Sequence, residues 1–202
     1  MHELNLSVFI HQLFIDRLLV YDACVLYPAP LRDLLMQLAL SDLFRARWTK
    51  QIHDEWIRNV LKNRPDLTLE QLTRTKQLMD NNVRDCLVTN YEYLIPSLQL
   101  PDIDDRHILA AAIAGGAEAI ITFNLSDFPQ SILNQYNIAA QHPDEFISNL
   151  LDLKLSKVIA AARTCQRRLK NPPKSFDEYL EILLKQGLSV SVSIFQELYD
   201  ET

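Results

Sequence analysis

Four acidic residues that lie far apart in the chain could together bind a divalent cation: Asp22, Glu55, Asp105 and Asp127. Asp22 follows the apolar run 18–21, and an ionised carboxylate in such a run costs several kcal/mol to bury unless something pairs with it. We therefore expect Asp22 at the carboxyl end of a central strand, where the crevice of an open α/β sheet lies. Carboxylates that converge there would repel one another, and Mg²⁺ or Mn²⁺ would relieve the repulsion. Such an ion promotes phosphodiester hydrolysis.

Each of these acids also has a simpler explanation when it is taken alone. Asp22 could form a turn at the end of its strand, and Glu55 could be a partly exposed helix residue. Asp105 could only cap a helix or lie in its first turn, where negative charge is favourable. Asp127 could cap the turn that follows it. The sequence predicts a metal site only if the fold brings all four together.

Apolar periodicity predicts the elements that must position these acids. Alternating strand and helix patterns indicate a mainly parallel central sheet in a three-layer α/β fold. Glu55 shares a helical face with Ile52, so its side chain should point inward. The expected strands are 18–21, a short one within 43–48, 86–89, 119–123 and 138–140. The expected helices are one beginning at Pro30, one at 49–63, one beginning at Thr68, one from Asp105 to Gly115 and one beginning near His142.

The chain divides into three expected segments: an N-terminal extension (1–16), a main α/β domain (17–150) and a C-terminal helical appendage (151–202). Residues 1–16 could be an amphipathic helix, a dimerisation segment or sequence upstream of the core fold. The appendage should hold a basic helical stretch at 154–170, a linker at Pro172 and Pro173, and a last helix that Ser175 caps and Gly187 ends.

Composition is that of a soluble globular protein, because 48% of the 202 residues are hydrophobic and 23% are charged. We find no signal peptide and no run approaching the ~20 apolar residues that a membrane span needs. The three cysteines show no CxxC spacing, which disfavours a disulfide framework or a thiolate zinc site and favours a cytoplasmic location. A net charge of −6 argues against a large polyanion-binding surface, although it allows a local basic rim.

Three motifs in order resemble those of a PIN domain, and of the VapC-type toxin nucleases in particular. They are Val-Tyr-Asp22-Ala-Cys-Val-Leu, Asp104-Asp105-Arg-His-Ile-Leu-Ala-Ala-Ala and Ile-Ile-Thr122-Phe-Asn124-Leu-Ser-Asp127-Phe, with the helical Glu55 between the first two. The likeness covers roughly residues 17–150. It implies a three-layer αβα PIN-like fold, to which the C-terminal helices are added.

Family resemblance also implies an activity and a partner. Similar proteins are Mg²⁺- or Mn²⁺-dependent endoribonucleases that a cognate antitoxin restrains, and a homodimer is one further alternative for assembly. On this resemblance the catalytic and metal-binding residues are Asp22, Glu55, Asp105 and Asp127, and the auxiliary residues are Asp104, Thr122 and Asn124. Because Asp104 adjoins Asp105, one or both of these aspartates could face the metal. Apolar grooves beside the helices at 31–43 and 52–62 could hold a helix of the antitoxin.

Five basic residues are candidates for contact with RNA phosphates: Arg106, His107, Arg163, Arg167 and Arg168. Solvated helix residues are the alternative explanation for all of them. Two other functions stay open, namely a non-catalytic PIN-like module that binds RNA or protein and a housekeeping RNA-processing nuclease. An aspartyl-nucleophile phosphatase is disfavoured because Cys24 occupies the place, two residues after Asp22, where that chemistry usually has a second acid.

Overall fold

The computed structural model describes residues 17–200, so the expected N-terminal extension at 1–16 lies outside the described residues. The elements within this range alternate between strands and helices, and helices alone follow the last strand. In chain order they are β1 (Leu18–Tyr21), α2 (Ala23–Leu26), α3 (Ala29–Ala39), β2 (Arg45–Arg47), α4 (Lys50–Asn63), α5 (Leu69–Asn82), η1 (Glu92–Ser97), α6 (Arg106–Ala114), β3 (Ala119–Ile121), η2 (Leu125–Asp127), α7 (Gln130–Leu133), η3 (Asn134–Tyr136), β4 (Ala139–Gln141), α8 (Pro143–Arg168), α9 (Phe176–Leu184) and α10 (Ser189–Asp200).

The sheet has four parallel strands in the order β2-β1-β3-β4. Tyr21 pairs with Ile121, and Ile121 pairs with Gln141, so three neighbouring strands end at the same level. The residues that follow them, Asp22 and Thr122 among them, are therefore neighbours at the carboxyl edge of the sheet. In open α/β sheets, binding sites usually lie in a crevice at the carboxyl ends of the parallel strands.

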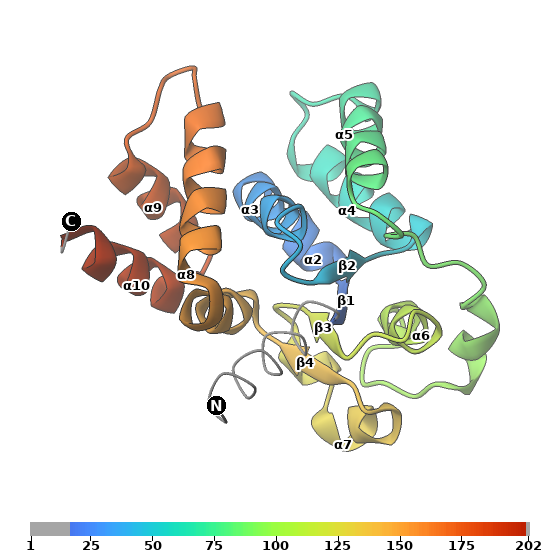
Figure 1. Cartoon of the computed structure of the whole chain (residues 1–202). Helices are drawn as coiled ribbons and strands as arrows, with labels where there is room; N and C mark the ends of the chain where they lie inside the picture. Colours follow the sequence, from blue (N-terminus) through green and yellow to red (C-terminus); the bar gives the residue numbers. More distant parts are fainter. Residues whose placement is uncertain (1–16, 201–202) are drawn as a thin grey trace, which may run out of the picture.

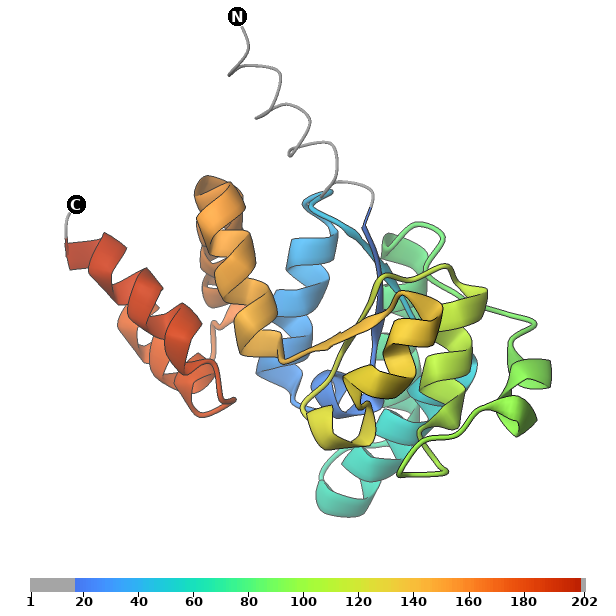
Figure 2. The same ribbon diagram turned by 90° about the horizontal axis from the view of Figure 1, so that it is seen from below.

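Helices cover both faces of the sheet (Figures 1 and 2). α3 and α8 lie together on one face, and α6 lies on the other. The two central strands, β1 and β3, are apolar and almost entirely buried, as expected for a parallel sheet covered on both sides, whereas the outer strands β2 and β4 carry arginine and glutamine and are more exposed. The arrangement confirms the predicted three-layer αβα fold with added C-terminal helices.

A buried polar network fixes α4, the helix that carries Glu55. The Asp80 Oδ1 of α5 accepts from Trp48 Nε1 at 2.8 Å and lies 2.9 Å from His53 Nε2. Trp56 Nε1 donates to His53 Nδ1 at 2.9 Å. Because Nδ1 accepts, Nε2 carries the hydrogen and both ring nitrogens of His53 are satisfied. α4 is therefore tied to α5 and to the end of β2 by hydrogen bonds as well as by apolar packing.

The predicted strand at 86–89 is wrong. Leu87 forms only an isolated bridge with Trp48, whose backbone N–H donates to Cys86 O and whose carbonyl accepts from Val88 N. β2 ends at Arg47 and α4 begins at Lys50, so the chain offers this segment a single residue to pair with. Cys86 and Val88 are buried by side-chain packing instead of by sheet formation.

The C-terminal helices differ from the prediction in two ways. α8 spans Pro143–Arg168 as two helical segments that meet at a kink at Lys154, whose backbone is non-helical, and the expected boundary between residues 150 and 151 falls inside the first segment. α10 was not predicted. The division into domains at 150 stays a prediction, since the shared helix joins the two segments.

None of the helices formed by residues 17–200 is long and apolar enough to cross a membrane.

Candidate active site

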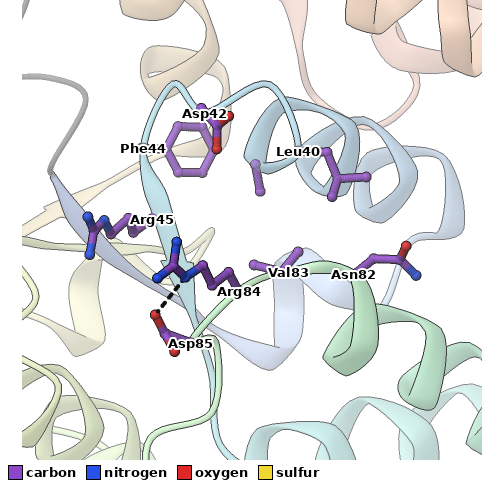
Figure 3. Close-up of a pocket in the computed structure, with 9 residues that line it drawn as sticks. Leu40, Asp42, Phe44, Arg45, Asn82, Val83, Arg84 and Asp85 are labelled. Carbon is purple, nitrogen blue, oxygen red and sulfur yellow. Dashed lines mark ion pairs between the residues drawn. The ribbon is translucent and has the colours of Figure 1, made fainter.

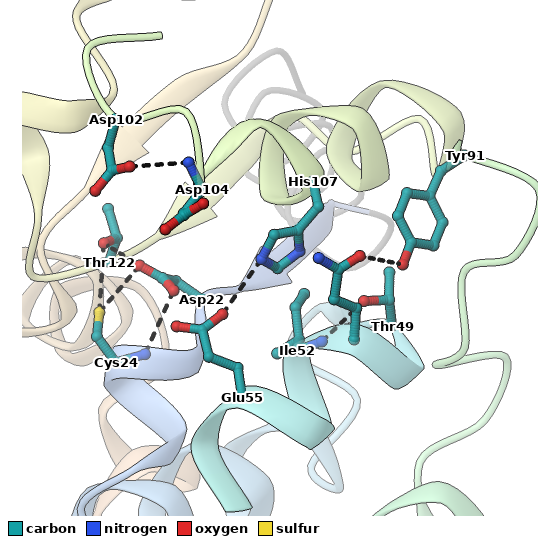
Figure 4. Close-up of polar contacts among 11 residues, drawn as sticks. Asp22, Cys24, Thr49, Ile52, Glu55, Tyr91, Asp102, Asp104, His107 and Thr122 are labelled. Atoms are coloured by element: carbon teal, nitrogen blue, oxygen red, sulfur yellow. Dashed lines mark hydrogen bonds and ion pairs between the residues drawn. The ribbon is translucent and has the colours of Figure 1, made fainter. Parts of the chain in front are cut away.

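Asp22 lies at the carboxyl end of β1 and is 2% exposed. Its backbone N–H continues the sheet by donating to Ile121 O at 3.1 Å, and its side chain caps α2 by accepting from Cys24 N at 3.3 Å. The other carboxylate oxygen accepts from the Thr122 hydroxyl at 2.6 Å and from the Cys24 thiol at 3.1 Å (Figure 4). The side chain is therefore fixed by three donors from two neighbouring segments.

Thr122 links this carboxylate to the loop after β3. Its buried hydroxyl donates to Asp22 and accepts from Asn124 N at 2.9 Å. The Asn124 side chain is exposed. Thr122 is thus part of the hydrogen-bond network around Asp22, and Asn124 joins the network through its backbone.

Burial and charge act against each other at Asp22. Burial raises the pKa of its carboxyl, hydrogen bonds from Thr122 and Cys24 lower it, and the negative charge of Glu55 raises it again. The net shift is upward, so ionised Asp22 is held at a cost that a cation would reduce.

Asp105 precedes the first residue of α6, but its side chain makes no capping hydrogen bond. A simple capping role therefore does not explain it. The pKa of Asp105 is raised to about 7, with burial as the largest cause and the rest from the charges of Asp22, Asp102, Asp127 and Glu55. The fold thus brings the other three predicted acids close enough to influence Asp105 electrostatically.

Glu55 extends from α4 toward the N-terminal end of α6. Its Oε2 lies 3.2 Å from Nε2 of His107, and the Glu55 side chain is 28% exposed (Figure 4). The inward orientation expected for Glu55 is therefore present, and its partner is a histidine that we had expected in solvent or at RNA. His107 is 4% exposed, so its ring offers no donor to a polyanion at the surface.

Of the remaining predicted acids, Asp127 is the last residue of η2, and Asp104 lies in the loop before α6. Asp127 is partly buried and accepts from the Ser126 hydroxyl at 3.4 Å. The Asp104 side chain is exposed, while its backbone N–H donates to Asp102 at 2.8 Å. The loop before α6 therefore directs Asp104 more toward solvent than Asp105.

The donor set fits a hard divalent cation. Within residues 17–200, no three His, Cys, Asp or Glu side chains form a ready-made metal cluster. Mg²⁺ usually takes one or two protein carboxylates and completes its shell with water and substrate phosphate, so a closed cage is not required. Neighbouring negative charges raise the pKa of the Asp22 and Asp105 carboxyls, which a cation would offset, and Asp22, Glu55, Asp105 and Asp127 are the residues that could hold such an ion.

Most of the predicted basic RNA contacts are engaged inside the chain. Arg168 pairs with Asp33 at 3.2 Å and donates to Gln37 at 2.8 Å, and Arg163 stacks on the Phe176 ring. These contacts attach α8 to α3 and α9. Arg167 is exposed and Arg106 is partly buried beside the acidic residues, so these two are better placed for RNA.

Sequence reasoning missed two contacts of the acidic residues. The Cys24 thiol donates to Asp22, and the buried His107 contacts Glu55. One signal was available for His107. The apolar run 108–112 has no polar face, which indicates a helix buried all round, and a polar residue in such a helix needs a partner.

Two family profiles and one curated protein match parts of this chain. The family profile of the PIN domain matches residues 18–126, more than half of the chain, and a profile described as the VapC50 C-terminal domain matches residues 143–197. A curated protein of Mycobacterium tuberculosis named "Putative ribonuclease VapC50" is 53% identical over 49 residues. That alignment covers 24% of this chain and 29% of the relative. No solved structure gives a significant match.

The matched ranges follow the order of the motifs. Asp22, Glu55 and Asp105 lie inside the range of the first profile, and Asp127 lies one residue beyond it. The second profile begins where α8 begins. The resemblance inferred from the motifs is confirmed: this chain belongs to the PIN domain family and carries a VapC50-type C-terminal domain after its PIN domain.

Proposed function

We propose that this protein is a Mg²⁺- or Mn²⁺-dependent endoribonuclease that hydrolyses RNA phosphodiester bonds as the toxin of a toxin–antitoxin pair in the cytoplasm. The observation that carries the nuclease proposal is the buried Asp22 at the carboxyl edge of the sheet, with Glu55 held beside the start of α6 by its contact with His107 and with Asp105 directly before that helix. Uncompensated carboxylates in a partly buried crevice are costly, which favours a role that needs them. Family membership and the name of the partial relative give independent support.

Each residue has a distinct part in this chemistry. Asp22, fixed by Thr122 and Cys24, would be the most rigid ligand, and Asp105, before α6, is near enough to Asp22 and Asp127 to be influenced by their charges. When bound, a divalent ion supplies activation of water and stabilisation of charge on the scissile phosphate. The exposed rim carries Asp104, Asn124 and the partly buried Arg106, where a single strand of RNA could lie.

Removing divalent metal should abolish RNA cleavage, because the acidic crevice would otherwise repel the phosphate. The test uses purified full-length protein and a single-stranded RNA in EDTA, followed by addition of Mg²⁺ or Mn²⁺ in excess. We expect no cleavage in EDTA and recovery with either ion. Undiminished cleavage in chelator would contradict metal dependence.

The antitoxin proposal has a physical basis in two adjoining hollows between α3 and α5. One, of about 470 Å³, is lined by apolar side chains of Met36, Leu78 and Met79. The other, of about 250 Å³, is lined by Phe44 and Val83 and rimmed by charged residues, as Figure 3 shows. Leu40 and Asn82 line both hollows. An amphipathic helix could place its apolar residues here, while an Arg or Lys of the same partner paired with the carboxylates of the active site.

Expression of this chain alone should stop cell growth, and the Asp22→Asn variant should not, because a free ribonuclease damages its own cell. Co-expression with the small gene encoded beside it should give a stable complex without nuclease activity. Normal growth at high levels of soluble, metal-binding wild-type protein would contradict the toxin proposal. It would favour the housekeeping nuclease instead.

The second candidate is a non-catalytic PIN-like module that binds RNA or protein. The acidic residues weigh against it, since a binding-only module does not need them. Mn²⁺ titration separates the two, because the module need not bind the ion at Asp22.

A further inference from the structure

We propose that His107 is a positioning residue that holds the Glu55 carboxylate in the orientation needed for the metal. This inference rests on the proposed function and assigns a residue to it. His107 Nε2 lies 3.2 Å from Glu55 Oε2, across 52 residues of sequence. Among residues 17–200, Glu55 makes no other hydrogen bond or ion pair, so this contact alone restrains the end of a flexible side chain.

The contact joins the two helices that flank the acidic residues. Glu55 belongs to α4, whereas His107 lies in the first turn of α6, two residues after Asp105. Fixing Glu55 to this turn therefore sets its position relative to Asp105 as well. A hydrogen bond of this kind, from a residue behind a metal ligand, orients the ligand and commonly accounts for about 10- to 100-fold in metal affinity.

His53, also buried, is a histidine with a purely structural role. His53 uses both ring nitrogens, one toward Asp80 and the other toward Trp56. His107 uses Nε2 alone, and its buried Nδ1 has no partner in the described part of the chain. A carboxylate oxygen accepts and cannot donate, so Nε2 carries the hydrogen. The imidazole ring is thus oriented so that Nε2 donates to Glu55, while its buried Nδ1 makes no hydrogen bond.

Two substitutions separate the hydrogen bond from the packing. In His107→Gln the amide nitrogen can still donate to Glu55, whereas His107→Leu retains an apolar side chain without a donor. We expect Mn²⁺ affinity, measured by isothermal titration of the full chain, to fall about 10-fold in His107→Leu and to stay near the wild-type value in His107→Gln.

A double-mutant cycle with Glu55→Gln tests whether the effect passes through Glu55. We expect His107→Leu to cause no further loss of Mn²⁺ affinity in the Glu55→Gln background. An equal loss in both backgrounds, or no loss in either, would overturn the positioning role. If the wild type binds Mn²⁺ and His107→Leu has no effect, only this inference fails. If the wild type does not bind Mn²⁺, the proposed function fails with it.

A measurement that leaves His107 intact covers the case in which His107→Leu does not fold. In protein with ¹⁵N-labelled histidine, the Nε2 resonance of His107 should shift when Mg²⁺ is added, and the shift should be absent in Glu55→Gln. If the wild-type protein binds Mg²⁺ but the chemical shift of His107 Nε2 does not change, the inference is overturned.

Discussion

Replacing Asp105 with Asn should reduce RNA cleavage by at least about 10²- to 10³-fold, the scale of losing one preorganised electrostatic contact to a transition state. The same substitution should preserve or raise the melting temperature in EDTA. Asn has nearly the shape of Asp, and it removes a charge that burial and four neighbouring carboxylates disfavour. Loss of function with gain of stability distinguishes a metal ligand from a structural residue. The same loss of cleavage is expected for Asp22→Asn, with a smaller gain of stability or none, because the amide would lose a hydrogen bond from Thr122 or Cys24.

The stability gained by Asp105→Asn should depend on pH in a definite direction. The pKa of Asp105 is raised from 3.8 to about 7, so the folded state resists ionisation more than the unfolded chain does. Its contribution to stability is fully present below pH 3.8 and is lost as pH rises through about 7. The stability gain of Asp105→Asn in EDTA should therefore be small near pH 4 and largest above pH 7. Melting curves of both proteins across this range check it.

Asp104→Asn is the matched control, since it removes the same charge from the adjacent, exposed residue. It should reduce cleavage less than Asp105→Asn does. The reverse ranking would mean that Asp104 is the ligand. A large loss of metal-free melting temperature in both Asp22→Asn and Asp105→Asn would favour structural capping instead.

Asp144→Asn should lower the free energy of unfolding by about 2–4 kcal/mol, because this buried side chain joins α8 to α10 by charge-assisted hydrogen bonds. Asp144 Oδ1 accepts from the backbone and the hydroxyl of Ser191 at 2.8 and 2.6 Å. Its Oδ2 accepts from Val190 N at 2.8 Å. These backbone donors belong to the first turn of α10, where the helix itself supplies no acceptors. An amide would turn its NH₂ group toward a donor.

Urea unfolding measures the effect, and Glu145→Gln supplies the control. Glu145 is the next residue of α8 and is exposed, so its substitution should change the free energy of unfolding by less than about 0.5 kcal/mol. Equal stability of the two variants would show that the appendage does not depend on Asp144.

The position of Asp22 was predictable because a single carboxylate at the end of an apolar run has few acceptable environments. The helix that carries Glu55 was predicted from its apolar periodicity, and the end of the helix that follows Asp105 was predicted from the glycines after Ala114. In both cases the deciding information is local in the sequence. Apolar periodicity and capping residues involve positions that are close together in the sequence, so they can be recognised before the fold is known.

The errors arose where the outcome depends on distant partners. Residues 86–89 look like a strand, but sheet formation also needs a neighbour, and only Trp48 is available. The alternation of Ser and Val at 189–193 has no helical period, yet α10 forms because Asp144 caps it and the apolar side chains of Val192 and Phe195 are buried. The contact between His107 and Glu55 likewise depends on two helices meeting.

The most direct test of the account is an anomalous-scattering map from crystals of the protein soaked in Mn²⁺. The account predicts a peak about 2.1 Å from carboxylate oxygens of Asp22 and Asp105, with Glu55 and Asp127 in its immediate surroundings. The peak should be absent from crystals of Asp22→Asn. A peak elsewhere, such as on the exposed side chains of Asp102 and Asp104, or no peak in a protein that still cleaves RNA, would contradict the claim that these four acids form the metal site.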